Sequence, residues 1–378
     1  MKIPLNIPSV SNLEKKYVNE AIKQNWLSIN GKNTKIFEKK FGILVKRKFT
    51  LAVQSGTAAL HATLKGLGIK KNDNVIVPDY TCVSNLSAVS QCQAKAILVD
   101  LERDTLGLDY EKTKSAILKY KPKALQLVHV YGFPARDTIK IINLCKKKKI
   151  FVIEDGSESL GAELENKKIG SFGDVSVFSV RSEKMIGVGE GGVITTNNKK
   201  IYDRIKLIAS RNSPYRSTRD PYWKKYYTSG EGYNYLMPHL LGSVARAQVE
   251  RFKKKILLEK IKVGKLYRKI FKEKKITFTQ KILPNHRPVF WLNSIYFNTL
   301  SQKQVQKVGE GLMKIGIEVR SGFWPLHDMP NFLSKKNKKK ESVEIFKKTL
   351  VLPSSYNLNE KDIKFIYKKV LNLLNKYN

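Results

Sequence analysis

The spacing of apolar positions changes repeatedly along the chain. Short apolar runs, of the length of buried strands, alternate with segments in which apolar residues recur every three or four positions. This alternation predicts an α/β fold with a mostly parallel central sheet and helices on both faces. We expect strands at residues 50–54, 74–78, 94–100, 124–129, 151–155, 175–180 and 192–196, and helices at residues 57–67, 82–92, 109–120, 136–148 and 199–210.

Both ends of the chain add elements to this core. Residues 11–24 form an expected first helix, because Ser11 and Glu14 have capping-box spacing ahead of an apolar stripe. A long basic helix, expected at 239–275, leads into a smaller α+β domain. We therefore divide the chain into a large domain, residues 1–250, and a small domain, residues 251–378. In the small domain we expect strands at 290–298 and 318–323 and helices at 301–315 and 359–375.

Composition narrows the class of protein. With 378 residues, 42% of them hydrophobic, the chain can bury a large core. It has no apolar run long enough to span a membrane, and its first residues lack the apolar core of a secretory signal. The three cysteines have no metal-ligand spacing, so we expect no metal and a reduced, cytoplasmic protein.

The net charge of +39 raises the possibility of a nucleic-acid partner. The lysines, however, are spread over every segment, arginine is much scarcer, and no nucleic-acid-binding motif is present. We therefore interpret the charge as a lysine-rich surface and expect no nucleic-acid partner. Such a surface would still attract a small anionic ligand.

Two short motifs follow predicted strands. Residues 55–60, SGTAAL, open a helix, whose first N–H groups and positive dipole end favour an anion. Asp155 ends the strand 151–155, at the edge where open α/β sheets bind ligands. A carboxylate in that position can keep a pyridine nitrogen protonated. Taken singly, an ordinary capped helix and a surface carboxylate remain alternative interpretations.

Lys184 differs from the many other lysines in its surroundings. It lies between the strand 175–180 and the glycine-rich stretch GVGEGG at 187–192. A lysine that attacks an aldehyde needs an uncrowded approach, and glycines let the backbone come close to a cofactor. Ser179 precedes Lys184 by five residues and could reach the same anion as Thr57. Most lysines are solvated surface charges, so only the residues around Lys184 distinguish it from the other lysines of the chain.

In order and spacing these motifs, together with GYNYLM at 232–237, resemble the DegT/StrS-type sugar-nucleotide aminotransferases. The resemblance covers nearly the whole chain, from residue 26 to LPSS at 352–355. It implies the type I, aspartate aminotransferase-like fold of enzymes that use pyridoxal 5'-phosphate (PLP). It also implies a homodimer with shared active sites.

The resemblance implies a role for each motif residue. Lys184 is expected to bind PLP covalently and to carry the transferred proton, and Asp155 to pair with the pyridine nitrogen. Glu158 is expected near the 3-oxygen of PLP. The expected phosphate contacts are Gly56, Thr57, Ser179 and, in the neighbouring subunit's site, Asn234.

One position departs from the family pattern. Family members usually carry an aromatic residue directly after Thr81, where its ring stacks on PLP. This chain has Cys82 at that position. Tyr80 could supply the ring instead, or Cys82 could pack against the cofactor.

The resemblance also implies two half-reactions, with L-glutamate as amino donor and a nucleotide-linked keto-sugar as acceptor. Residues 289–292, 318–320 and 323–327 are most similar to the branch that aminates C4 of GDP-4-keto-6-deoxymannose. Its product, GDP-perosamine, serves surface polysaccharides such as the O-antigen of lipopolysaccharide. The expected substrate contacts are Ser28, Arg320, Trp324 and His327. The last three could bind either the carboxylate of glutamate or the nucleotide-sugar.

Three alternatives stay open at this point. The acceptor could be a dTDP- or UDP-keto-sugar aminated at C3 or C4. The protein could be a catalytically silent relative that binds PLP, since membership of a family does not establish turnover. Trp324 could pack between the domains instead of binding substrate.

Overall fold

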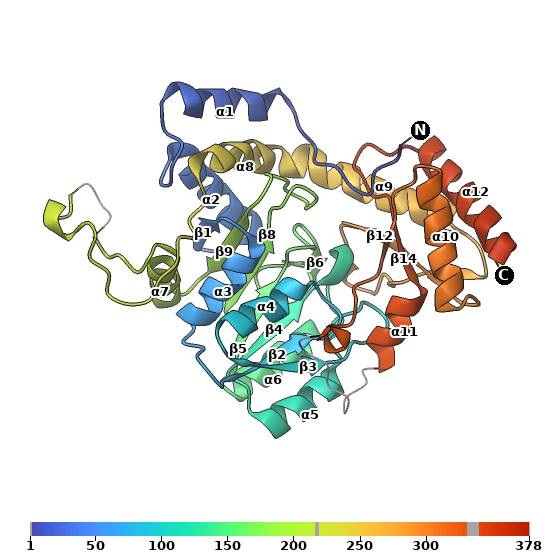
Figure 1. Ribbon diagram of the computed structural model, residues 1–378, viewed down its shortest axis with the longest axis horizontal. Helices are drawn as coiled ribbons and strands as arrows, with labels where there is room; N and C mark the ends of the chain where they lie inside the picture. Colours follow the sequence, from blue (N-terminus) through green and yellow to red (C-terminus); the bar gives the residue numbers. More distant parts are fainter. Residues whose placement is uncertain (1, 216–218, 331–339, 378) are drawn as a thin grey trace.

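The computed structural model describes residues 2–215, 219–330 and 340–377 (Figure 1). Its central sheet has seven strands in the order β1-β9-β8-β5-β4-β2-β3. Within this sheet β9 alone runs antiparallel to its neighbours, which confirms the mostly parallel sheet. The strands are β1 (Phe49–Val53), β2 (Asn74–Pro78), β3 (Lys95–Val99), β4 (Ala124–Val128), β5 (Phe151–Asp155), β8 (Val175–Ser179) and β9 (Gly192–Thr196).

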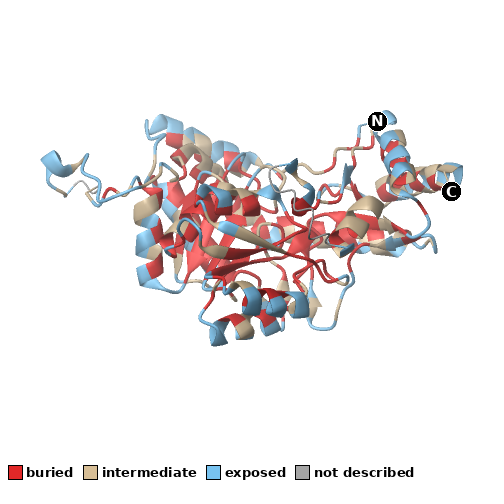
Figure 2. Ribbon diagram, turned by 60° about the horizontal axis from the view of Figure 1, so that its bottom comes forward, coloured by how far each residue is buried: buried red, intermediate tan, exposed pale blue. Residues whose placement is uncertain are grey.

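Helices cover both faces of the sheet, as the sequence pattern predicts. Along β2, Val75 and Val77 pack into a core cluster with the helices of one face, whereas Ile76 packs with those of the other. This alternation follows from the two-residue period of a strand. Figure 2 shows the strands buried between helices whose outer faces are exposed. The helices are α3 (Gly56–Gly66), α4 (Val83–Gln91), α5 (Tyr110–Tyr120), α6 (Thr138–Lys147) and α7 (Lys199–Ala209).

The N-terminal helices pack on the long helical segment near the middle of the chain. The expected first helix is α1 (Asn12–Lys23), with both hydrogen bonds of its capping box formed. A second helix, α2 (Lys32–Val45), was not expected and packs with α1 against α8 (His239–Arg251). The long basic helix is broken by a π-helical turn, η3 (Phe252–Ile256), and its last part, α9 (Leu257–Ile270), ends before residue 275.

The small domain has an antiparallel sheet in the order β10-β12-β14-β13. Among its strands and α-helices, β10 (Ile276–Phe278), β14 (Thr349–Leu352) and α11 (Lys340–Lys348) were not expected. Its other elements are β12 (Asn293–Phe297), β13 (Arg320–Ser321), η4 (Leu326–Asp328), α10 (Gln302–Lys314) and α12 (Glu360–Tyr377). Short strands β6 (Glu163–Leu164), β7 (Lys167–Lys168) and β11 (His286–Arg287) pair separately, and η1 (Val130–Gly132) and η2 (Tyr222–Lys224) are single turns.

The beginning of the chain lies with the small domain. Ile3 forms a β-bridge with Ile317 and packs in the small domain's core cluster. A boundary near residue 250 remains our proposal for the main division, with this N-terminal segment as an addition to the small domain. No described helix is long and apolar enough to cross a membrane.

Lys260 of α9 ties three separate segments together. Its buried Nζ donates to Oδ1 of Asn6 at 2.7 Å, to the carbonyl of Ser354 at 2.5 Å and to the carbonyl of Trp291 at 3.3 Å. Burial lowers the pKa of this ammonium to about 7. The folded state therefore releases a proton that the unfolded chain keeps until its ordinary pKa of 10.5.

We expect the stability of the protein to depend on pH through Lys260. Between about 7 and 10.5 the unfolded state binds more protons, so the free energy of unfolding rises with pH, by at most about 1.4 kcal/mol per pH unit. Lys260→Met removes this contribution, and its stability relative to the wild type should fall as pH rises through that window. Chemical denaturation at several pH values measures the difference. The exposed Lys262→Met on the same helix is the control, and an equal slope in both variants would contradict the prediction.

Candidate active site

A cavity of about 660 Å³ lies at the carboxyl edge of the central sheet. Val128, Asp155 and Ser179 line it, and they are the last residues of β4, β5 and β8. The ends of neighbouring parallel strands meet at one edge, so these residues converge although they are distant in sequence. Trp291, from the small domain, also lines the cavity.

The start of α3 forms an anion cradle on one side of the cavity. The Ser55 hydroxyl caps the helix by accepting from the N–H of Ala58 at 3.0 Å. The N–H groups of Gly56 and Thr57 belong to the first turn and have no partner within the helix. A Cβ on Gly56 would lie 3.0 Å from the Cβ of Ser179, so glycine leaves the space that an anion needs. Three of the expected phosphate contacts, Gly56, Thr57 and Ser179, therefore line the same cavity.

Asp155 lies at the floor of the cavity and is almost fully buried. Its oxygens accept hydrogen bonds from the side-chain amide of Asn85 at 3.1 Å and from the N–H of Ser157 at 2.9 Å. Both donors are neutral, and a buried carboxylate is most stable beside a positive charge. A protonated pyridine nitrogen fits this position.

The neighbouring Glu154 points away from the cavity. Its carboxylate accepts from the N–H groups of Gly170 at 2.6 Å, Phe172 at 2.8 Å and Gly173 at 2.9 Å. It therefore organises the turn before β8. Of the two adjacent carboxylates in the sequence motif, only Asp155 is available to a ligand, because side chains alternate across a strand.

Lys184 and Glu158 form an ion pair in the lining of the cavity. The Nζ of Lys184 lies 3.1 Å from Oε1 of Glu158, whose Oε2 accepts from the N–H of Tyr131 at 2.9 Å. Burial raises the pKa of Glu158, and the ammonium of Lys184 opposes this shift. The ring of Trp291 covers Lys184 on another side, with its centroid 3.6 Å from Nζ.

The position of Tyr80 does not match the expectation that its ring could stack on PLP. Tyr80 has no exposed surface and does not line the cavity; its hydroxyl lies 3.4 Å from that of Tyr131 inside the core. Its ring is therefore not placed to stack on a cofactor. Cys82, by contrast, is exposed and lines the cavity, as the expectation of packing against the cofactor requires.

The expected substrate residues divide into two groups. Arg320 and Trp324 line the cavity, and about half of each side chain is exposed. His327 is instead buried outside it, with Nδ1 2.7 Å from Oδ2 of Asp79, so the pair fastens the small domain to the end of β2. Ser28 is exposed and does not line the cavity of its own chain. Asn234 also lies outside its own chain's cavity and is exposed.

Several cavity residues were not singled out from the sequence. Arg181 and Glu183 lie in the segment before Lys184, where the sequence argument treated them as context. Trp291 lies more than one hundred residues from Lys184, and no local pattern connects the two. Asn85, which fixes Asp155, lies on α4 and gives no signal of its own.

Comparison with known proteins identifies the family. A model of the DegT/DnrJ/EryC1/StrS aminotransferase family matches residues 8–371, so the chain belongs to this family. It is 31% identical over 375 residues to the GDP-perosamine synthase of Escherichia coli O157:H7, with 97% of each chain covered. It is 32% identical over 387 residues to the GDP-perosamine synthase of Vibrio cholerae, with 99% of each covered.

Solved structures confirm the fold. The Helicobacter pylori aminotransferase PseC, involved in the biosynthesis of pseudoaminic acid, matches with a TM-score of 0.91 at 21% identity and full coverage of both chains. A 3-amino-5-hydroxybenzoic acid synthase matches with a TM-score of 0.87 at 20% identity and 99% coverage of each. The expected enzyme class, a PLP-dependent sugar-nucleotide aminotransferase, is confirmed.

We expect Lys184→Ala to lower the rate of amino transfer from glutamate by about 100-fold or more, since the variant lacks the group that moves the proton. Formation of 2-oxoglutarate measures this rate. Lys199→Ala, on the exposed face of α7, is the matched control and should retain wild-type activity. Comparable turnover in the two variants would show that Lys184 is not required for proton transfer.

Proposed function

We propose that this enzyme transfers the amino group of L-glutamate to C4 of GDP-4-keto-6-deoxymannose and so forms GDP-perosamine. The names of the relatives that match nearly the full chain support the acceptor. One observation carries the proposal: a single cavity joins Lys184, Asp155 and the anion cradle to exposed Arg181 and Arg320. The inner part suits PLP, and the outer part suits a diphosphate.

In this proposal each inner residue has one task. PLP, when bound, supplies the electron sink that lets a carbon next to the amino group lose its proton. The first turn of α3 and Ser179 hold the phosphate. Asp155 would pair with the pyridine nitrogen, and Glu158 would lie near the 3-oxygen. The Nζ of Lys184 takes the α-proton from the amino donor and would deliver it to the cofactor carbon that carries the amino group.

The outer residues suit an anionic nucleotide. Arg181 and Arg320 come from different domains, and their side chains are 56% and 57% exposed. Arg181 donates to Oε1 of Glu190 at 3.0 Å, and Arg320 lies 3.7 Å from Oε1 of Glu318. The two arginines also share one carboxylate, since Oε1 of Glu183 lies 3.5 Å from Arg181 and 3.9 Å from Arg320. An incoming diphosphate can replace this carboxylate with charge-assisted hydrogen bonds to both guanidinium groups. Trp324 offers a half-exposed ring to the base.

We also propose that the enzyme is a homodimer whose subunits share active sites. An arm that includes η2 projects from the body of the subunit (Figure 1) and exposes large aromatic side chains. Tyr222, Trp223 and Tyr226 are 81%, 69% and 99% exposed, which is unusual for a surface that faces only water. Asn234 follows this arm and would contact the phosphate in the partner's cavity.

A cytoplasmic reaction that feeds surface polysaccharide synthesis is the setting we propose.

The acceptor is tested with the purified, PLP-loaded enzyme. After reaction with glutamate and removal of excess donor, GDP-4-keto-6-deoxymannose should be converted to an amino sugar, with the amine at C4 by nuclear magnetic resonance. Conversion of dTDP- or UDP-keto-sugars in its place would establish the alternative acceptors. A normal yield of 2-oxoglutarate with no amination of any nucleotide-sugar would refute the proposed acceptor class.

We expect Arg320→Ala to raise the KM for the nucleotide-sugar about tenfold or more, because a charge-assisted hydrogen bond to the diphosphate is lost. The release of 2-oxoglutarate from glutamate should stay close to wild type, since that half-reaction involves no diphosphate. Steady-state kinetics with each substrate varied in turn measures both. Arg287→Ala, an exposed arginine outside the cavity, is the control.

Shared active sites predict complementation between inactive variants. Asn234→Ala should weaken the partner's site, and Lys184→Ala inactivates its own. In a mixed dimer one site combines the intact Lys184 of one subunit with the intact Asn234 of its partner, so mixing the two variants should restore activity. Activity is measured after subunit exchange, beside each variant alone. A mixture no more active than the sum of its components would place Asn234 outside the site.

A further inference from the structure

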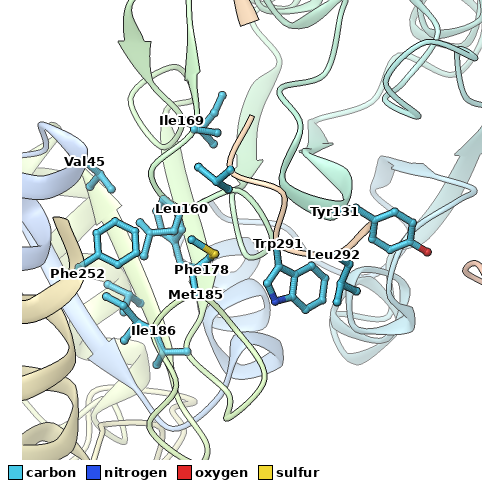
Figure 3. Packing of buried hydrophobic residues seen from close by; sticks show 14 of the residues in the cluster. Val45, Tyr131, Leu160, Ile169, Phe178, Met185, Ile186, Phe252, Trp291 and Leu292 are labelled. Atoms are coloured by element: carbon cyan, nitrogen blue, oxygen red, sulfur yellow. The ribbon is translucent and has the colours of Figure 1, made fainter. Parts of the chain in front are cut away.

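Trp291 closes one side of the cavity directly over the amino group of Lys184. The centroid of its ring lies 3.6 Å from Nζ, and only 4% of the residue is exposed. Figure 3 shows the indole among the buried side chains that include Tyr131 and Leu292. A cation held against a ring face and shielded from water is attracted more strongly than one at an exposed site.

The ring is held in this position from several directions. Its Nε1 donates to the carbonyl of Glu183 at 2.7 Å, and Glu183 is the residue directly before Lys184. Its own carbonyl accepts from the buried ammonium of Lys260 at 3.3 Å. The ring also packs at an angle against Tyr131, with centroids 6.5 Å apart. The small domain thus fixes the ring to the same stretch of backbone that carries the lysine.

Few charged groups approach the amino group of Lys184. Glu158 lies 3.1 Å away, and Asp155 lines the same cavity. The side chain of Glu183 is turned toward the guanidinium groups of Arg181 and Arg320, which neutralise it. A cofactor that engages Glu158 would remove that carboxylate as a partner of Lys184, and the ring of Trp291 would then be the remaining neighbour of Nζ.

We propose that Trp291 is a positioning residue whose ring holds the protonated amino group of Lys184 during proton transfer. The inference rests on the proposed role of Lys184. As the C–H bond of the donor breaks, its electron pair stays on the carbon skeleton, and the lone pair of Nζ takes the proton. The ring stabilises this ammonium and fixes its direction until the N–H bond breaks and the proton is delivered to carbon.

The same attraction has an opposite effect on cofactor capture. The neutral amine, with its lone pair free, is the form that bonds to an aldehyde, with loss of water. An attraction for the ammonium withdraws this form. Weakening the ring face should therefore slow the glutamate half-reaction but speed the uptake of PLP by the apo-protein. A residue that merely packs would change both rates in the same direction.

The test uses the full-length protein with 5-fluorotryptophan in place of tryptophan, because fluorine weakens the negative face of the ring with little change in shape. Single-turnover release of 2-oxoglutarate and uptake of PLP near pH 7 are measured, with Trp291→Phe and Trp291→Leu alongside. We expect the half-reaction to slow from tryptophan to phenylalanine to leucine, by about tenfold in total. The uptake of PLP should accelerate in the same order.

The chain provides its own control, because it has four tryptophans. In Trp291→Phe, fluorination changes only the other three and should leave both rates unchanged. Two rates that fall together, or no effect of fluorination in the wild-type sequence, would overturn the proposal. The readouts need no nucleotide-sugar, so a wrong acceptor would not affect them. Full activity of Lys184→Ala would instead show that the proposed role of the lysine has failed.

Discussion

The site depends on the convergence of parallel strands at one edge of the central sheet. Val128, Asp155 and Ser179 end three neighbouring strands and form the inner wall of one cavity. Because each strand ends at this edge, the loops that follow it can carry reactive groups without unpairing the sheet. The start of α3 completes the wall with the N–H groups of its first turn. A phosphate cradle and a buried carboxylate thus come from the same topology.

Three acidic side chains near the site differ because their surroundings differ. Glu154 accepts hydrogen bonds from three backbone N–H groups and from the hydroxyl of Ser176, and supports a turn. Asp155, one residue later, has two neutral donors and remains open to a cationic ring nitrogen. Glu158 is buried beside Lys184, and burial raises its pKa against the pull of the ammonium. Residue type therefore matters less here than the donors that surround each carboxylate.

The small domain supplies the part of the cavity lining that does not come from the central sheet. Arg320 and Trp324 form the open side of the cavity, and Trp291 covers the reactive lysine. The buried pair of His327 and Asp79 holds this domain against the end of β2, and Lys260 ties three segments within the domain together. The shape of the site is thus coupled to the packing of the two domains. A substrate bound at the domain junction would contact both at once.

The sequence by itself determined the alternating elements of the sheet, the capped start of α3 and the isolation of Lys184 beside a glycine-rich bend. These features are local, because strand period, capping and glycine content are set by neighbouring residues. Tertiary structure alone decided that Tyr80 and His327 are buried away from the cavity, that β14 pairs with β12 and β13, and that Trp291 faces Lys184. Such contacts join residues far apart in the chain, and only the packing of whole elements brings them together.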